Sequence, residues 1–394
     1  MASVPPAKGV TFAGCLVPVQ APCKSDRLVA GFCLQGDRVN LESIPGKDAE
    51  QDADFDRVHA DILRFFPKLV TELGGDPQSL LQRVGIDLSF LSQGQSKVGY
   101  RSIVNLLEFA AEQLQCPDFG MRLATLQRGG AVLGPIGVVM KNSNTLGEAL
   151  RYVARHCHAH SLAARVRLEQ DRISGKLFVG HEILADRLPN KRQAIEQLLL
   201  LGHLNAMEIT GGQARVREVH FRYQRLVSLT TYRRYFGCEI RFDQQEDGLI
   251  FHERDLLCPI VDADAQLHER ATTFIDTNFT RVTPPLHARV RGLVLQFIAT
   301  ENCSKERVAA ELHLHPRTLL RRLNAEGKCF EAIKDEVRRD MALGYLQGTD
   351  LPLRRIAEKI GYAEHSVLTR SCSRWFAATP RELRSRAVRC CHHM

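Results

Sequence analysis

The sequence predicts an α+β domain followed by an all-α domain that contains two helix-turn-helix units joined by a linker helix. Hydrophobic spacing changes between helical and strand-like periods up to about residue 270, and it is helical throughout from Leu286 onward. A short internal repeat lies within the helical part. The 394 residues, 44% hydrophobic and 25% charged, are typical of a globular chain of two or three domains.

The same pattern divides the chain into five segments. Residues 1–54 contain five prolines and end in an acidic run, so we expect a poorly ordered N-terminal extension. The α+β domain is predicted to span residues 55–270 and a linker residues 271–285. The all-α domain follows over 286–388, and 389–394 form a short Cys/His tail.

The elements of the α+β domain are read from its periodicity. Apolar residues at spacings of three and four predict helices at Phe55–Leu73, Ser102–Leu114, Thr145–His158 and Arg192–Ile209. Alternating residues predict one hairpin from Leu162–Leu168 and Ile173–Val179, a strand at Val216–Tyr223, and a second hairpin from Cys238–Phe242 and Gly248–Phe251.

The repeat in the all-α part has the layout of two helix-turn-helix units. Val308–Leu314 aligns with Ile356–Tyr362 at an offset of 48, whereas Leu319 aligns with Leu368 at an offset of 49. The second turn is therefore one residue longer. In each copy an apolar helix, a turn and an Arg-rich helix follow one another, and in this layout the second helix enters the major groove of DNA.

Local signals mark where these helices begin. Ser304 is placed to cap the first helix, Pro316 stands at a first helical position, and Ser366 lies in the first turn of the last helix. A linker helix is predicted at Phe330–Leu346. The residues expected to form the core of the two units are Ala309, Leu312, Leu319, Leu323, Ile356, Ala357, Gly361, Leu368 and Trp375.

The charge of the chain is concentrated in the same region. The formal net charge is +8, and residues 281–394 alone carry 21 Lys and Arg against 12 Asp and Glu, a balance of +9. A near-neutral body joined to a basic end favours contact of that end with nucleic acid. A solvated basic surface explains the charge equally well, so the prediction of nucleic-acid binding depends on the helix-turn-helix pattern.

These residues resemble the AraC/XylS-type bacterial transcription regulators. The resemblance covers about 80 residues with several motifs in the family's order. They are His315–Leu323 (HPRTLLRRL), Arg338–Ala342, Ile356–Tyr362 (IAEKIGY), Ser366–Arg370, Arg374–Phe376 and Pro380–Arg384. The family usually has Phe at the positions of Leu368 and Cys372, and Gly at that of Ala377, so packing of the last helix is expected to be looser.

The upstream domain resembles a sensor domain of one branch of this family. Gly134–Gly137, Ser143–Leu150, Tyr235–Gly237 and Phe242 are similar to the arabinose-binding-type domain found in ornithine-utilisation and virulence regulators. The resemblance implies a sequence-specific DNA-binding transcriptional regulator, which we expect to be an activator. Its promoter binding would be modulated by a small-molecule effector in the N-terminal domain.

The family's motif also assigns roles to residues of the two Arg-rich helices. The expected base-contacting residues are Arg317, Thr318, Arg321, His365, Ser366 and Arg370. The expected phosphate-contacting residues are Arg322, Thr369 and Arg374. The partners implied are double-stranded promoter DNA, RNA polymerase and an effector of unknown identity, and a homodimer is left open.

Other functions are less well supported. No nucleophile elbow, phosphate loop or paired-carboxylate motif stands out, so we expect no enzyme and no cofactor. We expect no metal site either, because His156, Cys157, His158 and His160 spread around a helix end, and Cys390, Cys391, His392 and His393 lie on a terminal tail. No run of the ~18 to 20 apolar residues that span a membrane occurs, and scattered cysteines favour the cytoplasm.

Several alternatives stay open at this point. The chain is a regulator without effector control, or it senses redox state or metal through its cysteines, or it is a non-specific architectural DNA binder. A group of cations is ambiguous between contact with an anionic effector and solvated faces, and we prefer the second. Its members are Arg155, Arg165, Arg167, Lys176 and Arg192.

Overall fold

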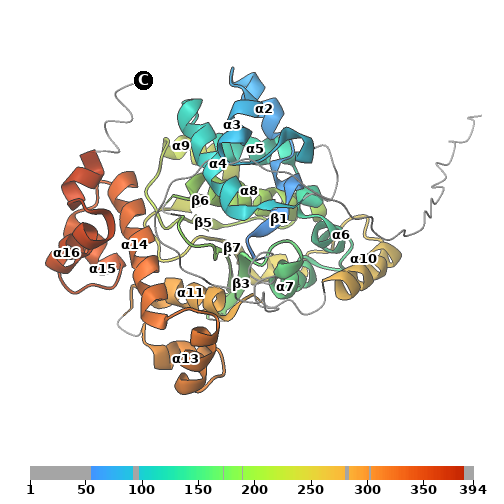
Figure 1. The fold of residues 1–394 in the computed structure, drawn as a ribbon. Coiled ribbons are helices and arrows are strands. Elements are labelled where there is room, and N and C mark those ends of the chain that lie inside the picture. The colour runs from blue at the N-terminus through green and yellow to red at the C-terminus, as the bar shows by residue number, and fades with distance from the viewer. Residues whose placement is uncertain are drawn as a thin grey trace, which may run out of the picture. The chain divides into compact units, whose positions relative to one another are not determined.

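The computed structural model describes residues 55–91, 97–171, 173–188, 190–279, 284–300 and 303–385 (Figure 1). The predicted N-terminal extension and the Cys/His tail lie outside these residues. Within them, an α+β domain is followed by an all-α region with two helix-turn-helix units, which confirms the predicted fold class. None of the helices described is both long and apolar enough to cross a membrane.

The α+β domain begins with a small helical layer. β1 (Arg57–His59) pairs antiparallel with β2 (Lys97–Gly99), and four helices follow or flank this pair: α2 (Phe66–Glu72), α3 (Pro77–Arg83), α4 (Tyr100–Gln113) and α5 (Phe119–Gln127). α4 and α5 both pack on the long helix α8 (Arg192–Ile209), and their apolar faces belong to the main core of the domain.

The prediction of one continuous helix at Phe55–Leu73 is wrong. This segment forms β1, then the short 3-10 helix η1 (Ala60–Leu63), then α2. The break lies at Phe65, whose φ of 68° is left-handed. Pro67, which lacks an N–H and has a fixed φ, follows within the first turn of α2, so a helix could not run through this point with its hydrogen bonds intact. The apolar period continues across the break because η1 and α2 both turn apolar side chains into the same core.

A five-stranded sheet forms the second layer. Its strand order is β3 (Ala164–Asp171), β4 (Lys176–Ile183), β7 (Gly248–His252), β5 (Glu218–His220) and β6 (Glu239–Arg241). The first predicted hairpin is confirmed, since β3 and β4 pair antiparallel from Ala164 with Ile183 to Asp171 with Lys176. β3 continues to Asp171, into the predicted turn at Glu169–Arg172, and β4 starts at Lys176 instead of Ile173, so the chain reverses later than predicted.

The second predicted hairpin is wrong. β5 lies between β6 and β7, and it pairs parallel with β6 and antiparallel with β7. Two side chains at the ends of the supposed turn explain this. The ring of Phe242 stacks on Phe221, with centroids 5.6 Å apart, and the Asp247 carboxylate accepts a 2.8 Å hydrogen bond from the backbone N–H of Arg222. Both contacts join this segment to the end of β5.

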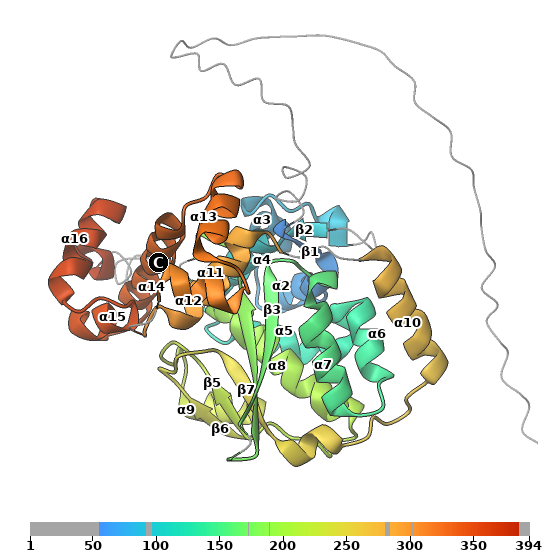
Figure 2. The ribbon, with the colours of Figure 1, turned by 90° about the horizontal axis from the view of Figure 1, so that it is seen from below.

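Helices cover the sheet as the periodicity predicts. α8 has both predicted bounds, and α4 starts two residues before its predicted start. α7 (Leu146–His156) is capped by Thr145, whose Oγ1 accepts a hydrogen bond from the N–H of Glu148, and it ends in the 3-10 helix η4 (Cys157–Ala159). α6 (Pro135–Lys141) lies between α7 and α10 (Ala265–Asn278) (Figure 2). Residues 271–278 of the predicted linker are therefore helical.

The C-terminal region contains two separate small cores on one linker helix. α11 (Leu286–Phe297), α12 (Lys305–Glu311) and α13 (Pro316–Ala325) form the first core with the start of α14 (Phe330–Gly348). α15 (Leu353–Lys359) and α16 (His365–Phe376) form the second core with the end of α14. Below, α12 and α13 are called the first unit, and α15 and α16 the second unit.

Candidate nucleic-acid interface

The helix starts of the first unit follow from its sequence. The Ser304 hydroxyl accepts a hydrogen bond of 3.2 Å from the N–H of Arg307, and the His315 Nδ1 accepts one of 3.2 Å from the N–H of Arg317. Pro316 occupies the first helical position of α13, where a missing N–H has no cost. The connecting turns are residues 312–315 in the first unit and 360–364 in the second, so the second is one residue longer, as the change of offset predicted.

One face of α13 is buried and the opposite face carries free positive charge. Leu319 and Leu323 are fully buried in the first core, together with Ala309 of α12, while Leu312 packs against its edge. The exposed face carries Arg317, Arg321 and Arg322, with Thr318 half-buried beside them. Among the described residues these three guanidinium groups have no ion pair and no side-chain hydrogen bond. The sequence prediction of an outward Arg face on this helix therefore agrees with the geometry.

The second unit repeats this arrangement, but its exposed face carries fewer unpaired arginines than that of α13. Leu368 of α16 is fully buried with Ile356 and Ala357 of α15. His365 and Arg370 are exposed, and Ser366 and Thr369 are half-buried on the same side. The Ser366 hydroxyl donates to Glu364 Oε2 at 2.9 Å, and the Thr369 hydroxyl donates to the carbonyl of His365 at 3.2 Å. The Arg370 guanidinium is without a partner within the described part of the chain.

Arg374, expected to contact a phosphate, and Trp375, expected to lie in the core, both join α16 to the linker helix. The Arg374 guanidinium donates to Asp335 Oδ1 at 2.6 Å, and the Trp375 indole N–H donates to Asp335 Oδ2 at 2.8 Å. Trp375 is half-buried at the edge of the second core rather than inside it. Arg374 is thus already paired, in contrast to the four free arginines of α13 and α16.

The turn of the second unit is held by a residue that sequence reasoning placed only on the linker helix. The Arg338 guanidinium donates to the carbonyls of Ile360 and Gly361, each at 3.1 Å, and lies 4.5 Å from the Tyr362 ring centroid. Gly361 has a φ of 70°, and a Cβ added there would lie 2.1 Å from the carbonyl oxygen of Ile298. Glycine is therefore required, and the second turn is fixed to both α14 and α11.

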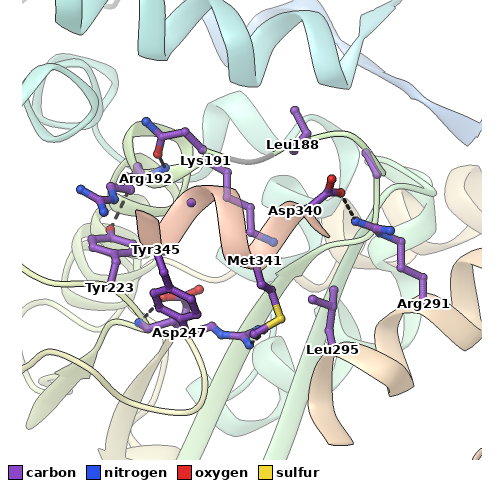
Figure 3. Close-up of a pocket in the computed structure, with 14 residues that line it drawn as sticks. Leu188, Lys191, Arg192, Tyr223, Asp247, Arg291, Leu295, Asp340, Met341 and Tyr345 are labelled. Carbon is purple, nitrogen blue, oxygen red and sulfur yellow. Dashed lines mark hydrogen bonds and ion pairs between the residues drawn. The ribbon is translucent and has the colours of Figure 1, made fainter. Parts of the chain in front are cut away.

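The linker helix also contacts the α+β domain around a small cavity of about 90 Å³, which both charged and apolar side chains line (Figure 3). Asp340 of α14 forms a 2.6 Å ion pair with Arg291 of α11 and accepts a 2.9 Å hydrogen bond from the backbone N–H of Arg187. Arg192, at the start of α8, donates to the carbonyl of Gly348 at 2.6 Å. Burial lowers the pKa of Lys191, beside this cavity, to about 8. Sequence reasoning missed this contact because 153 residues separate Arg187 from Asp340.

The histidines that resemble a metal cluster face different surroundings. His156 Nδ1 contacts the carbonyl of Tyr152 at 3.0 Å, and His158 Nε2 contacts that of Phe279 at 3.2 Å. His160 is buried elsewhere, against the sheet. Within the described ranges no group of three or more His, Cys, Asp or Glu side chains could hold a metal ion.

Most of the ambiguous cations have partners inside the domain. Arg165 pairs with Glu182 at 2.5 Å, and Lys176 pairs with Glu218 at 2.6 Å. Arg167 pairs with Glu182 and with Glu246. Together with the Arg192 contact, these pairs give four of the five cations a partner within the chain. Only Arg155, which donates to the carbonyl of Arg151, is an exposed helix residue.

Four buried or half-buried cysteines within the described ranges are poor redox sensors. Burial raises the pKa of Cys116, Cys238 and Cys372 to about 11 and that of Cys157 to about 12. Since the thiolate is the reactive form, these thiols are protected from oxidation at neutral pH. Cys15, Cys23 and Cys33 lie outside the described residues.

Comparisons with known proteins agree with this architecture. Residues 308–386 match a family described as a helix-turn-helix domain, and residues 74–260 match the N-terminal arabinose-binding domain of AraC transcription regulators. The HTH-type transcriptional regulator VirS of Mycobacterium tuberculosis is 36% identical over 322 residues, which cover 81% of this chain and 94% of VirS. The ornithine utilization regulator of Pseudomonas aeruginosa is 25% identical over 323 residues, which cover 80% of this chain and 93% of that regulator.

A solved structure is also similar. The crystal structure of the transcriptional regulator CdpR from Pseudomonas aeruginosa aligns over 82% of this chain and 98% of its own, at 19% identity and with a TM-score of 0.39. An α+β domain of the arabinose-binding type followed by two helix-turn-helix units on one linker helix defines a DNA-binding transcriptional regulator. The chain belongs to the AraC/XylS-type family of these regulators.

Proposed function

We propose that this regulator is an activator that reads an asymmetric promoter site with both α13 and α16, and that a small-molecule effector in the α+β domain modulates this binding. The observation that carries the DNA-reading part is the set of free, exposed guanidinium groups on these two helices. They are Arg317, Arg321, Arg322 and Arg370. Exposed arginines of this kind are the groups that contact guanine bases and phosphates.

The two helices are proposed to contact different half-sites of the promoter. Arg317, Thr318 and Arg321 would contact bases in one half-site, and His365, Ser366 and Arg370 would contact bases in the other. Each bidentate contact from Arg to guanine contributes about 1 to 3 kcal/mol of discrimination. Arg322 and Thr369 would contact phosphates. Arg374 would reach a phosphate only on leaving Asp335, so its main role in this proposal is to hold α16.

The spacing of the units supports simultaneous binding. α14 has 19 residues and is therefore about 28 Å long at ~1.5 Å per residue. Successive major-groove turns on one face of B-DNA are about 34 Å apart. Two units held on one such helix match adjacent turns of the duplex, so one chain would read two half-sites without a symmetric partner.

Effector control is supported by the contacts between the α+β domain and α14. Arg187 and Arg192 bond directly to Asp340 and Gly348 of this helix. If DNA also binds one arrangement of these contacts more tightly, an effector that prefers one arrangement changes DNA affinity, and DNA changes effector affinity by the same factor, as linkage requires. As an activator the protein would act on RNA polymerase at promoters in the bacterial cytoplasm, without catalysing a reaction itself. Sedimentation analysis of the purified protein distinguishes a monomer from a homodimer.

Footprinting on the DNA that flanks its own gene tests the reading function. The double variant Arg317→Ala, Arg321→Ala should bind this DNA at least about tenfold more weakly and lose its preference over scrambled DNA. The matched control is Arg354→Ala, an exposed arginine of α15 that pairs with Glu358 and lies outside the proposed reading face. Binding by the double variant as tight and selective as that of the wild type would show that α13 does not read this DNA.

A further inference from the structure

An apolar cavity lies inside the α+β domain, on the face of the sheet that α6, α7 and α8 cover. Its volume is about 110 Å³. The strands β3, β4 and β7 supply one wall, and the three helices supply the others. The apolar side chains that line it include Ile136, Met140, Leu150, Val179, Leu199 and Phe251.

Two histidines place hydrogen-bonding groups in this apolar wall. His160 is buried, and neither of its ring nitrogens has a hydrogen-bond partner among the described residues. The same is true of Nε2 of His181. Burial lowers the pKa of each imidazole to about 4, so both rings are uncharged at neutral pH and offer an N–H donor and a nitrogen acceptor.

The other lining residues contain no formal charge. The only further polar side chain is Asn205, whose amide contacts the Met140 sulfur at 3.5 Å, and the only thiol is Cys157. No Lys, Arg, Asp or Glu lines the described cavity. A carboxylate or an ammonium group placed here would lose its hydration without gaining an opposite charge.

We propose that this cavity is the effector site of the regulator and takes a small, uncharged, mainly apolar molecule with one hydroxyl or carbonyl group that hydrogen-bonds to His160 and His181. This inference rests on the effector control proposed above. Buried polar groups are nearly always hydrogen-bonded, so two unpaired imidazoles facing one cavity indicate a missing partner. A cavity of ~150 Å³ accommodates benzene, so a phenol-like ring would have to widen the 110 Å³ of this cavity slightly, and a ligand larger than a single ring does not fit.

The walls of this cavity lead directly to the linker helix. His181 lies in β4, and six residues further along the chain the N–H of Arg187 bonds to Asp340 of α14. Asn205 lies in α8, and at the other end of this helix Arg192 bonds to the carbonyl of Gly348. A ligand that shifts β4 against α8 therefore moves the two contacts that hold α14 to the domain.

Calorimetric titration of the full-length protein tests the cavity and the ligand class together. The probes are phenol, benzene and benzoate, which have similar size and differ in hydrogen bonding and charge. We expect saturable binding of phenol that is at least about tenfold tighter than that of benzene, and no detectable binding of benzoate. Tighter binding of benzoate than of phenol would overturn the proposal that the ligand is uncharged.

Four variants locate the binding. Ala206→Phe fills the cavity from α8 and should abolish phenol binding, with Gly202→Ala as a milder filling should the first variant fail to fold. His160→Leu should weaken phenol binding at least about tenfold. The matched control is His203→Leu. His203 is also buried with an unpaired Nδ1, but it packs beside Phe236 and does not line the cavity, so phenol affinity should be unchanged. Equal loss in both histidine variants would overturn the assignment.

Promoter binding separates this inference from the proposed effector control. The affinity of the wild type and of folded Ala206→Phe is measured with and without a small-molecule extract of the host cell. A response confined to the wild type supports the inference. An equal response in both proteins would leave effector control standing and overturn the cavity as its site. Phenol binding in the cavity of a protein whose promoter affinity responds to nothing would overturn effector control itself.

Discussion

Arg291 and Asp340 form a buried ion pair, with 2.6 Å between Nη2 and Oδ2, that joins α11 to the linker helix α14. Both side chains are less than 9% exposed. The same Asp340 oxygen accepts the backbone N–H of Arg187 from the α+β domain, and Oδ1 contacts the guanidinium of Arg339. One carboxylate thus connects the domain that is proposed to bind the effector with the helix that carries both units.

Removing this carboxylate should be costly. Asp340→Ala leaves Arg291 buried without its counter-ion, and breaking a buried pair in this way costs about 3 to 5 kcal/mol of unfolding free energy. Denaturant unfolding of the variant and the wild type measures the difference. The matched control Glu358→Ala removes one partner of an exposed pair on α15 and should change stability by less than about 1 kcal/mol. Similar effects from both variants would show that the Asp340 pair has no special role.

Replacing Ala377 should stabilise the second unit. Ala377 ends α16 with a φ of 49°, a left-handed conformation that glycine adopts without strain. Ala377→Gly is therefore expected to raise the unfolding free energy by about 0.5 to 1 kcal/mol, measured by thermal unfolding. Gly361→Ala is the opposing control. It introduces the same strain and a contact with the Ile298 carbonyl, so it should destabilise. A loss of stability in Ala377→Gly would contradict this reading of the helix end.

Two neighbouring arginines of α13 should behave differently on DNA. Arg322→Ala is expected to weaken specific and non-specific binding alike and to lower the slope of log K against log salt by about 1, as loss of one phosphate contact does. Arg317→Ala should instead cost about 1 to 3 kcal/mol on the specific site and relax the preference at one base pair. Binding measured over a range of salt concentrations on specific and scrambled DNA separates the two roles. Identical behaviour of the two variants would contradict the assignment of Arg322 to a phosphate and Arg317 to a base.

A buried carboxyl should make stability depend on pH. Glu196 accepts a 2.5 Å hydrogen bond from the Tyr232 hydroxyl, and burial raises its pKa to about 8 from an ordinary value of 4.5. Between these values the folded protein holds a proton that the unfolded chain releases, so stability falls as pH rises through this window, by up to about 1.4 kcal/mol per pH unit.

Glu196→Gln tests this directly. The amide keeps the acceptor for Tyr232 and carries no titrating proton, so the variant should lose less stability than the wild type between pH 5 and pH 8. Urea unfolding at several pH values gives the comparison. Glu269→Gln, an exposed position on α10, is the control and should leave the profile as it is in the wild type. A profile for Glu196→Gln that parallels the wild type would mean that this carboxyl does not carry the proton.

The C-terminal architecture could be predicted because its signals are local. Ser304 marks a helix start through a hydrogen bond from a residue three positions later, and Pro316 marks one through its fixed φ and missing N–H. The offset change from 48 to 49 appears as one extra residue in the second turn. The periodicity of α8 likewise gave both of its ends, Arg192 and Ile209. In these segments local preference and tertiary packing favour the same conformation.

One miss had a local signal, because Pro67 follows the left-handed Phe65 and the apolar period outweighed it in the prediction. The other misses arise where distant residues decide the conformation. β5 enters between β6 and β7 because Phe242 and Asp247 contact the end of β5. The Asp340 contact and the cavity at His160 join segments far apart in the sequence. Side-chain patterns carry no information on such pairings.

Inserting half a turn of DNA between the two half-sites is the most direct test of recognition by two units on one linker helix. A promoter site is first selected from random DNA, and affinity is then measured after insertion of about five or about ten base pairs at its centre. The half-turn insertion moves the second half-site to the opposite face, so affinity should fall to that of a single half-site, with the footprint over the other half lost. Unchanged affinity with a complete footprint after the half-turn insertion would contradict simultaneous reading by α13 and α16.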